Sequence, residues 1–182
     1  GITKITAADF EYANAAEYTI KLLGRSRAID DDTAEVMVAP FMLPKDHPLA
    51  MVYGVFNAVF VTGNMLGDSM YYGRGAGKLP TASAVVSDVI DCARHQGKVI
   101  MCFWDKEEVK LADIGEAERS FFIRAKAGAE DAVTAAFPGG RMVHLKDRKE
   151  DFGYFTQSMK EKDFQAKYEA LGGQMLGRIR LV

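Results

Sequence analysis

The stretch 73–95 constrains the fold more than any other, because three glycines lead directly into an amphipathic segment. The glycines, at positions 73, 75 and 77, predict a loop that can adopt positive φ angles and let another molecule approach the backbone. At a helix N-terminus, such a loop presents free N–H groups and the positive end of the helix dipole, which suit a phosphate or a carboxylate. A tight connection between a strand and a packed helix explains the same residues equally well.

A helix is predicted over 81–95. Pro80 suits a first helical turn, and Thr81 or Ser83 can cap the free amides there. Apolar residues then recur at helical spacing. The stretch is not a complete nucleotide-binding motif, because Lys78 stands where a dinucleotide fingerprint needs its third glycine and no Walker A sequence is present. It can contact a nucleotide but cannot bind one by itself.

Composition argues against several classes of protein. The 182 residues carry 23 basic and 25 acidic side chains, and this balance gives no electrostatic footprint for nucleic acid. No apolar run approaches the ~20 residues that span a bilayer. Two cysteines and three scattered histidines predict neither disulfides nor a metal site, and a reducing cytoplasm is expected. The chain starts without Met or a signal peptide, which suggests that it was cut from something longer.

Residues 1–110 alternate β-rich runs with short helices. Thr6 and Asp9 predict a capped helix whose buried side includes Phe10 and Ala13, with Tyr12 as a further candidate. The carboxylates at 30–32 are better explained as a solvated turn than as a metal site. Few helices separate the expected strands, so a largely antiparallel sheet covered by helix 81–95 is predicted. These strands are expected at 18–27, 34–43, 57–63 and 65–72.

The rest of the chain predicts a second unit. After an apolar run at 99–104 and a polar boundary near 110–118, the expected order is βαββαβ, as in ferredoxin-like domains. The fold class is therefore α+β: a mostly antiparallel or mixed sheet with covering helices over 1–110, followed by a βαββαβ domain over 118–182. The strands are expected at 121–126, 141–146, 152–158 and 176–182, and the helices at 130–137 and 160–171.

Several motifs resemble, in order, the C-terminal half of homoserine dehydrogenases. The resemblance covers 1–95 densely, and the segment 118–182 is similar to the ACT-type regulatory domain of bacterial members. The usual Asp-x-Pro-Gly of an ACT domain is replaced here by Gly128-Ala-Glu-Asp131-Ala-Val. The motifs are Gly1-Ile-x-x-Ile-Thr, Ile20-Lys-Leu-Leu, Pro48-Leu-Ala-x-Val-x-Gly-Val-x-Asn-Ala-Val and Tyr72-Gly-x-Gly-Ala-Gly-x-x-Pro-Thr-Ala-Ser-Ala-Val-Val-Ser-Asp.

The resemblance implies an oxidoreductase of threonine and methionine biosynthesis that interconverts aspartate semialdehyde and homoserine with NAD or NADP. It implies that Gly75, Ala76 and Gly77 lie against the nicotinamide cofactor and that Thr81 helps to cap or contact it. The family binds most of the cofactor on an N-terminal Rossmann domain, and its catalytic Asp and Lys lie in a Gly-x-Asp-x-x-x-Lys motif. Neither occurs in this sequence. No catalytic residue is therefore assigned, and these residues alone are expected to be inactive.

The resemblance also implies a homodimer, since family members pair through this region. The alternative interpretation is an amino-acid-binding regulatory module, with 119–182 as an effector sensor and 1–110 as its dimerisation platform. The glycine loop and the helix after it favour the dehydrogenase, because a sensor has no need of them.

Overall fold

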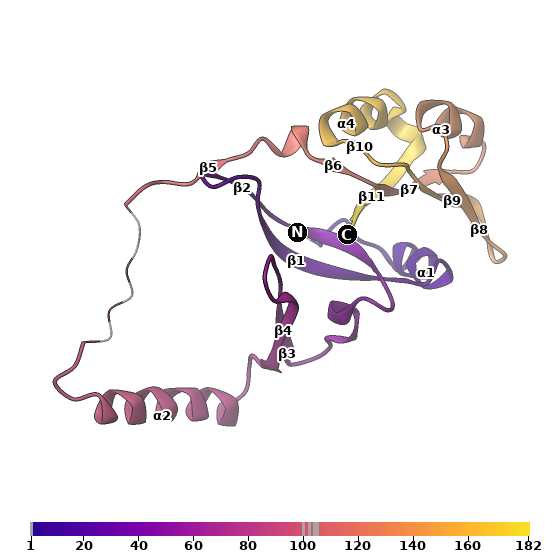
Figure 1. The fold of residues 1–182 in the computed structure, drawn as a ribbon. Coiled ribbons are helices and arrows are strands. Elements are labelled where there is room, and N and C mark those ends of the chain that lie inside the picture. Colours follow the sequence, from indigo (N-terminus) through magenta and orange to yellow (C-terminus); the bar gives the residue numbers. More distant parts are fainter. Residues whose placement is uncertain (1, 100, 102, 104–105) are drawn as a thin grey trace. The chain divides into compact units, whose positions relative to one another are not determined.

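The computed structural model describes residues 2–99, 101, 103 and 106–182 (Figure 1). Its contacts divide the chain into two compact units, one of residues 1–45 and 108–182 and the other of residues 46–107. The assignment of domains to 1–110 and 118–182 stays a prediction. The compact units follow a different division, because the first 45 residues pack with the C-terminal part of the chain. The predicted apolar run at 99–104 includes residues outside the described part.

The first unit is built on one mixed sheet. Its strands lie in the order β1-β2-β11-β7-β9-β8, and β5 also pairs with β2. Strands β11, β7, β9 and β8 lie side by side in that order. Numbered along the chain within this segment, they have the order 4-1-3-2 of a split βαβ fold, which confirms the predicted α+β class with a βαββαβ segment. The strands are β1 (Tyr18–Ala28), β2 (Thr33–Pro44), β5 (Lys110–Leu111), β7 (Phe121–Lys126), β8 (Arg141–Leu145), β9 (Arg148–Phe155) and β11 (Met175–Leu181). A separate pair joins β6 (Glu118–Arg119) to β10 (Met159–Lys160).

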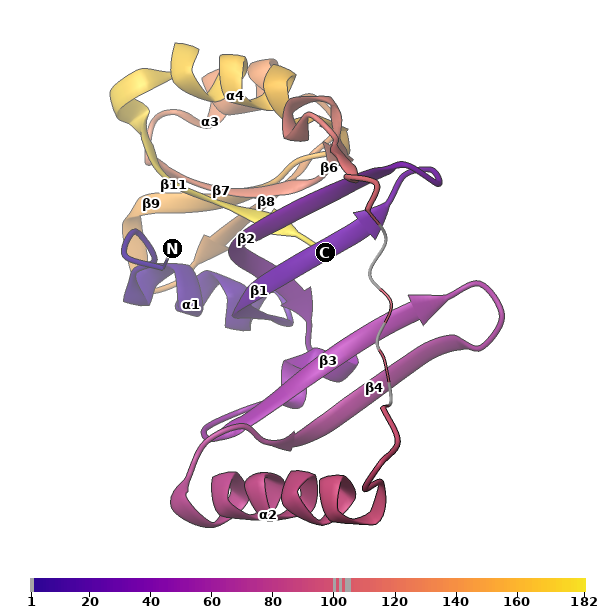
Figure 2. The ribbon, with the colours of Figure 1, turned by 90° about the vertical axis from the view of Figure 1, so that its left-hand side faces the viewer.

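Helices α3 (Glu130–Ala136) and α4 (Glu161–Ala170) cover one face of this sheet (Figure 2). Their apolar sides close a core around Phe121, Phe137 and Phe164, all almost fully buried. Both helices match their predicted positions. Strand β9 begins at Arg148, earlier than predicted, because the turn before it uses only residues 146 and 147. Two 3-10 turns complete the unit, η2 (Ile114–Glu116) and η3 (Gly172–Gln174).

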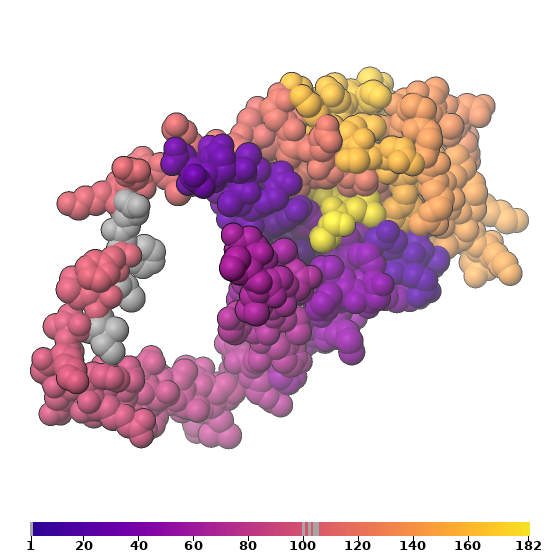
Figure 3. All heavy atoms as spheres, in the orientation of Figure 1, coloured from indigo at the N-terminus to yellow at the C-terminus, as the bar shows by residue number. Residues whose placement is uncertain are grey.

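Helix α1 (Ala7–Ala15) packs on a second apolar cluster, which includes residues of β1, β2, β7, β9 and β11. The predicted capping box is confirmed: the Asp9 carboxylate accepts hydrogen bonds from the Thr6 N–H at 2.7 Å and from the Thr6 hydroxyl at 2.8 Å. Tyr12 and Ala13 are buried, whereas the prediction for Phe10 is wrong, since it is 52% exposed. Its position on the helix turns it away from the side that holds Asp9, Tyr12 and Ala13. In Figure 3 the indigo N-terminal atoms adjoin the yellow ones of β11.

A buried ionic cluster holds α1 to the sheet. The Arg124 guanidinium donates to Asp9 at 2.8 Å and to Asp151 at 2.9 Å, and it reaches the Thr6 hydroxyl at 3.2 Å. The Tyr12 hydroxyl donates to the Asp151 carboxylate at 2.8 Å. Each buried charge therefore has a partner, which is the condition for keeping charges in an interior.

The second unit contains a hairpin and a helix. Strands β3 (Phe56–Gly63) and β4 (Gly67–Arg74) pair antiparallel, after the 3-10 turn η1 (Pro48–Met51). The predicted strand at 65–72 is displaced by two residues, because the turn extends to residue 66. The four strands expected to form one sheet do not do so, since β1 and β2 belong to the sheet of the first unit.

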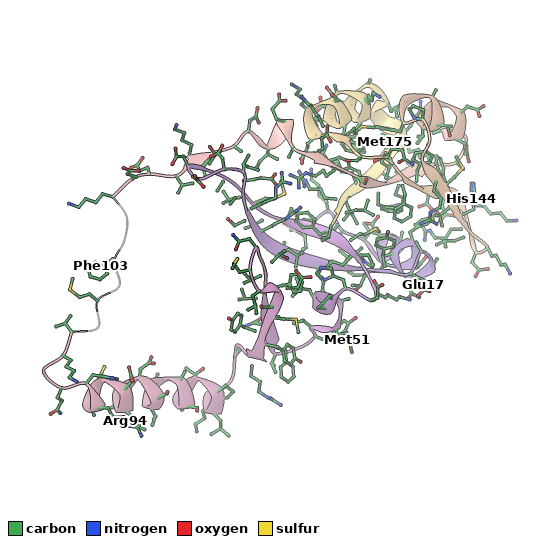
Figure 4. The ribbon with its side chains drawn as sticks, in the orientation of Figure 1. Glu17, Met51, Arg94, Phe103, His144 and Met175 are labelled. Carbon is green, nitrogen blue, oxygen red and sulfur yellow. The ribbon has the colours of Figure 1, made fainter. Side chains whose placement is uncertain are left out.

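Helix α2 (Lys78–Arg94) differs most from its prediction. It begins three residues earlier than expected and has no buried residue. The side chains around it, including Arg94, extend outward in Figure 4. The expectation that this helix covers a sheet is therefore wrong for the described residues. The predicted turn at 30–32 is confirmed, with the Asp30 carboxylate accepting from the Asp32 N–H at 3.0 Å.

Candidate functional site

The candidate site is the short link between β4 and α2, formed by Gly75, Ala76 and Gly77. Gly73 was expected in this loop but lies inside strand β4. The Gly75 N–H donates to the Val55 carbonyl at 3.1 Å, which ties the link to the residue before β3. All three residues of the link are exposed, so a ligand can reach their backbone.

Gly75 packs closely against the Asn57 side chain. A Cβ added there would lie 1.5 Å from Nδ2 and 2.6 Å from Cγ of Asn57, a residue of β3. No L side chain fits at position 75 unless the Asn57 amide moves. Asn57 thus fixes the start of the link, a role that sequence reasoning missed, although Asn57 lies in one of the motifs that carry the family resemblance. Only the cross-strand register brings it there, since Asn57 pairs with Gly73.

Gly77 is required by its backbone conformation. Its φ of 124° lies in a region that residues with a Cβ rarely adopt, and it forms the N-cap of α2. Thr81 was expected to cap the helix. It instead lies within the first turns and donates its N–H to the Gly77 carbonyl at 3.1 Å. The N–H groups of Lys78 and Leu79 have no acceptor within the helix, and Pro80 has no N–H.

The electrostatics of the link favour an anion. The free amides of the first helical turn carry the positive end of the dipole, and no acidic residue lies in that turn. Lys78 and Arg74 flank the link on either side. The Arg74 guanidinium lies over the Phe56 ring at 5.1 Å, and the Phe56 ring stacks on Tyr72 at 4.8 Å. The arrangement can hold a phosphate or a carboxylate group against the backbone.

The histidines lie apart from this link and have local partners. The His95 ring lies 2.9 Å from the Asp91 carbonyl at the end of α2. The His47 ring accepts from the Leu49 N–H at 3.1 Å, at the start of η1. His144 lies on β8 in the other unit (Figure 4). Among the described residues none of the three lies beside a nucleophile, and the carboxylate next to His95 is that of Asp91 on the same helix, at 3.3 Å from Nδ1.

No group of three or more His, Cys, Asp or Glu side chains is arranged to hold a metal ion in the described part of the chain. None of the helices in that part is long and apolar enough to cross a membrane.

Comparison with known proteins identifies the family. A family model described as homoserine dehydrogenase matches residues 1–90. The chain is 38% identical to the homoserine dehydrogenase of Helicobacter pylori over 133 residues, which are 73% of this chain and 31% of that protein. It is 50% identical to that of Synechocystis over 94 residues, which are 50% of this chain and 22% of that protein.

The structure gives the same result over a longer span. The homoserine dehydrogenase of Thiobacillus denitrificans superposes with a TM-score of 0.81 and 29% identity, covering 100% of this chain and 46% of that one. A structure of the Staphylococcus aureus enzyme superposes with a TM-score of 0.72 and 25% identity, also over 46% of its length. The chain spans about a third or less of the curated relatives that it matches. The chain therefore belongs to the homoserine dehydrogenase family and corresponds to part of the length of these members.

Proposed function

We propose that these residues form the C-terminal part of a homoserine dehydrogenase and lie against its nicotinamide cofactor through Gly75, Ala76, Gly77 and Thr81. The observation that carries the proposal is the link itself. It is exposed, opens a helix with free amides and needs glycine at 75 for packing and at 77 for conformation. The reaction proposed is the interconversion of aspartate semialdehyde and homoserine.

The link fits a dinucleotide as one wall of its site. The exposed backbone of Ala76 and Gly77 lets a planar ring or a phosphate approach the link, and the amides of Lys78 and Leu79 can donate to it. NAD or NADP would supply the hydride chemistry. The residues of this chain bind and orient, and they offer no complete dinucleotide fingerprint. Residues outside these 182 are proposed to bind most of the cofactor and to supply the catalytic groups, so the 182 residues alone should not reduce NAD or NADP with homoserine.

We also propose a homodimer. On one face of the β3–β4 hairpin, Val59 and Tyr71 lie opposite each other and are 61% and 69% exposed. On α2, Val85, Val86, Val89 and Ile90 are all between 46% and 62% exposed. Exposed apolar surface of this kind favours association, because burying a Val side chain contributes about 1.5–3 kcal/mol. The partner is proposed to be a second copy of the protein.

A chimera tests the dehydrogenase proposal. The 182 residues would replace the matched segment of the Thiobacillus denitrificans enzyme, which is 46% of that chain. The chimera is expected to reduce NAD or NADP with homoserine. A second variant, Ala76→Asp, places a negative charge in the exposed link and should lower kcat/KM for the cofactor by about tenfold or more, through repulsion of the phosphates.

The control is Ala76→Asn, which adds nearly the same volume as Asp without its charge and should leave kcat/KM within about twofold of the parent. Equal kinetics for the Asp and Asn variants of an active chimera would refute the placement of the link against the cofactor. A folded chimera without activity, checked by circular dichroism, would refute the assignment of the 182 residues to that part of the enzyme.

The second candidate function is a regulatory module that binds an amino acid. The 4-1-3-2 sheet with two helices on one face favours it, since this is the architecture of the ACT-type domain that the sequence resembles. Calorimetric titration of the chain with each amino acid tests it. Binding that also changes the activity of the chimera is the expected result for a sensor.

A further inference from the structure

A cavity of about 500 Å³ lies in the first unit, and its lining includes no residue of the glycine link. Three segments form its walls: α4, the beginning of β11, and the residues that lead into α1. The volume is within the range of sites that hold small molecules, about 300–1,000 Å³. The proposed cofactor function does not involve this cavity.

One wall of the cavity is a strand edge. Strand β2 pairs with β11 only at Arg180 and Leu181, so in the described part of the chain residues 175–179 of β11 have β7 as their only strand partner. Residues 176–179 line the cavity. The edge of a strand presents backbone N–H and C=O groups, which can bind a polar ligand.

Arg178 is the distinctive side chain of this wall. Its guanidinium carbon lies 5.3 Å from the ring centroid of Tyr168 and 5.8 Å from that of Phe164. Both rings belong to α4 and pack in or against the core of the first unit, and they restrict the guanidinium to one region. The Nη1 of Arg178 is buried and has no hydrogen-bond partner among the described residues.

Four other arginines of the first unit differ from Arg178 in having an acidic partner. Arg119, Arg124, Arg148 and Arg180 are each bound by at least one carboxylate. Arg178 is partly buried as they are, yet has no acidic partner among the described residues. A buried donor without an acceptor is costly, and each such group in a native structure requires an explanation.

The charges around the cavity indicate what the missing partner is. Asp9 is already bound by Arg124, and Glu169 accepts from Gln165, while Lys4 adds a second cation at the rim. A single carboxylate group would give the Arg178 guanidinium the acidic partner that it lacks among the described residues, because a guanidinium binds a carboxylate with two parallel hydrogen bonds. A phosphate dianion would meet stronger repulsion from the two acidic side chains.

We propose that this cavity is a binding site for a small monocarboxylic acid, held by the guanidinium of Arg178. The acid group lies against Arg178, the edge of β11 offers backbone hydrogen bonds, and Tyr168 provides an apolar surface for the carbon chain. The proposal depends on neither the cofactor link nor the dimer.

Isothermal titration calorimetry of the full 182-residue chain tests the proposal. The probes are acetate, propionate and butyrate, their amides, and inorganic phosphate. At least one acid is expected to bind in a 1:1 ratio, with its amide weaker by about tenfold or more. Arg178→Met keeps the packing on the rings and should weaken acid binding by about 10- to 100-fold. Arg141→Met is the matched control, because Arg141 also lies over an aromatic ring, Phe155 at 4.5 Å, but does not line the cavity.

NMR of the unsubstituted chain decides the question if Arg178→Met does not fold. The Nε–H signal of Arg178 should shift on adding the acid and not on adding the amide. Four results would overturn the proposal: no saturable binding of any acid, equal binding of acid and amide, tighter binding of phosphate than of every acid, or acid binding that leaves Arg178 unaffected.

Discussion

The two compact units of this chain bury their side chains very differently. In residues 1–45 and 108–182, two aromatic clusters are nearly inaccessible to solvent and buried arginines meet carboxylates. In residues 46–107, the helix has no buried residue and the hairpin exposes valines on β3 and tyrosines on β4. Both units carry regular secondary structure and apolar patterning, so neither property distinguishes them.

The difference shows that an amphipathic pattern predicts a helix or strand but does not tell which surface buries its apolar face. The first unit contains the surfaces that its helices need, and its stability comes from its own contacts. The second has apolar faces that the described residues leave exposed, and it needs a further surface to bury them. The predictions below test this contrast, beginning with the largest expected effect.

Removing the central buried charge should damage the first unit severely. Arg124→Met leaves the carboxylates of Asp9 and Asp151 without their shared partner, and breaking a buried ion pair in this way costs about 3–5 kcal/mol. Urea unfolding followed by circular dichroism measures the loss. Arg94→Met, on the exposed end of α2, is the control and should change the free energy of unfolding by less than about 0.5 kcal/mol. Similar losses for the two variants would contradict the contrast between the units.

Charging the hairpin should affect association rather than folding. Val59→Lys with Tyr71→Lys replaces an exposed cross-strand pair, and should weaken the proposed dimer by about 3 kcal/mol, the contribution of two apolar side chains. Light scattering over a range of concentrations measures the dissociation constant. The urea midpoint of the first unit should not change. A protein that is monomeric before substitution would refute the dimer.

Acid should destabilise the first unit through Asp151. Burial opposes its charged form, but hydrogen bonds from Arg148, Tyr12 and Arg124 outweigh this effect and lower the carboxyl pKa to about 2 from 3.8. A lowered pKa stabilises the fold above the unfolded value, and this stability is lost as the pH falls from about 4 to about 2. The loss is about 2 kcal/mol. Unfolding measured at several pH values should show it, and Asp151→Asn, although less stable, should lack this part of the pH dependence.

The smallest effect is expected at the glycine link. Gly75→Ala forces the Asn57 amide to move, and because Asn57 is exposed the cost should be about 1 kcal/mol. Gly73→Ala is the matched control, since a Cβ there meets no atom within 4 Å. Asn57→Ala should remove most of the Gly75→Ala effect, as expected for two residues in direct contact. Hydrogen exchange of the β3–β4 amides measures all three variants, and additive effects would show that Asn57 does not fix the link.

Much of the secondary structure could be predicted because its signals are local. The Thr6–Asp9 capping box, strand 121–126 and the helices near 130–137 and 160–171 are determined by neighbours in sequence, and the structure confirms them. The family resemblance also depends on short motifs, and the comparisons confirm the family. The errors in the bounds of helices and strands amount to about one turn. For example, α2 starts at Lys78 because Gly77 is its N-cap, which local residue preferences alone did not show.

By itself, the sequence determined the elements, the βαββαβ order and the glycine link, since each depends on residues a few positions apart. Only the tertiary structure decided that the first 45 residues pack with the C-terminal sheet, because that depends on Arg124 meeting Asp9 and Asp151 across long stretches of chain. It also decided that Asn57 packs against Gly75 and that Arg178 has no acidic partner among the described residues. The physical reason is the same in each case: a contact between distant residues is set by strand register and packing, which no local pattern encodes.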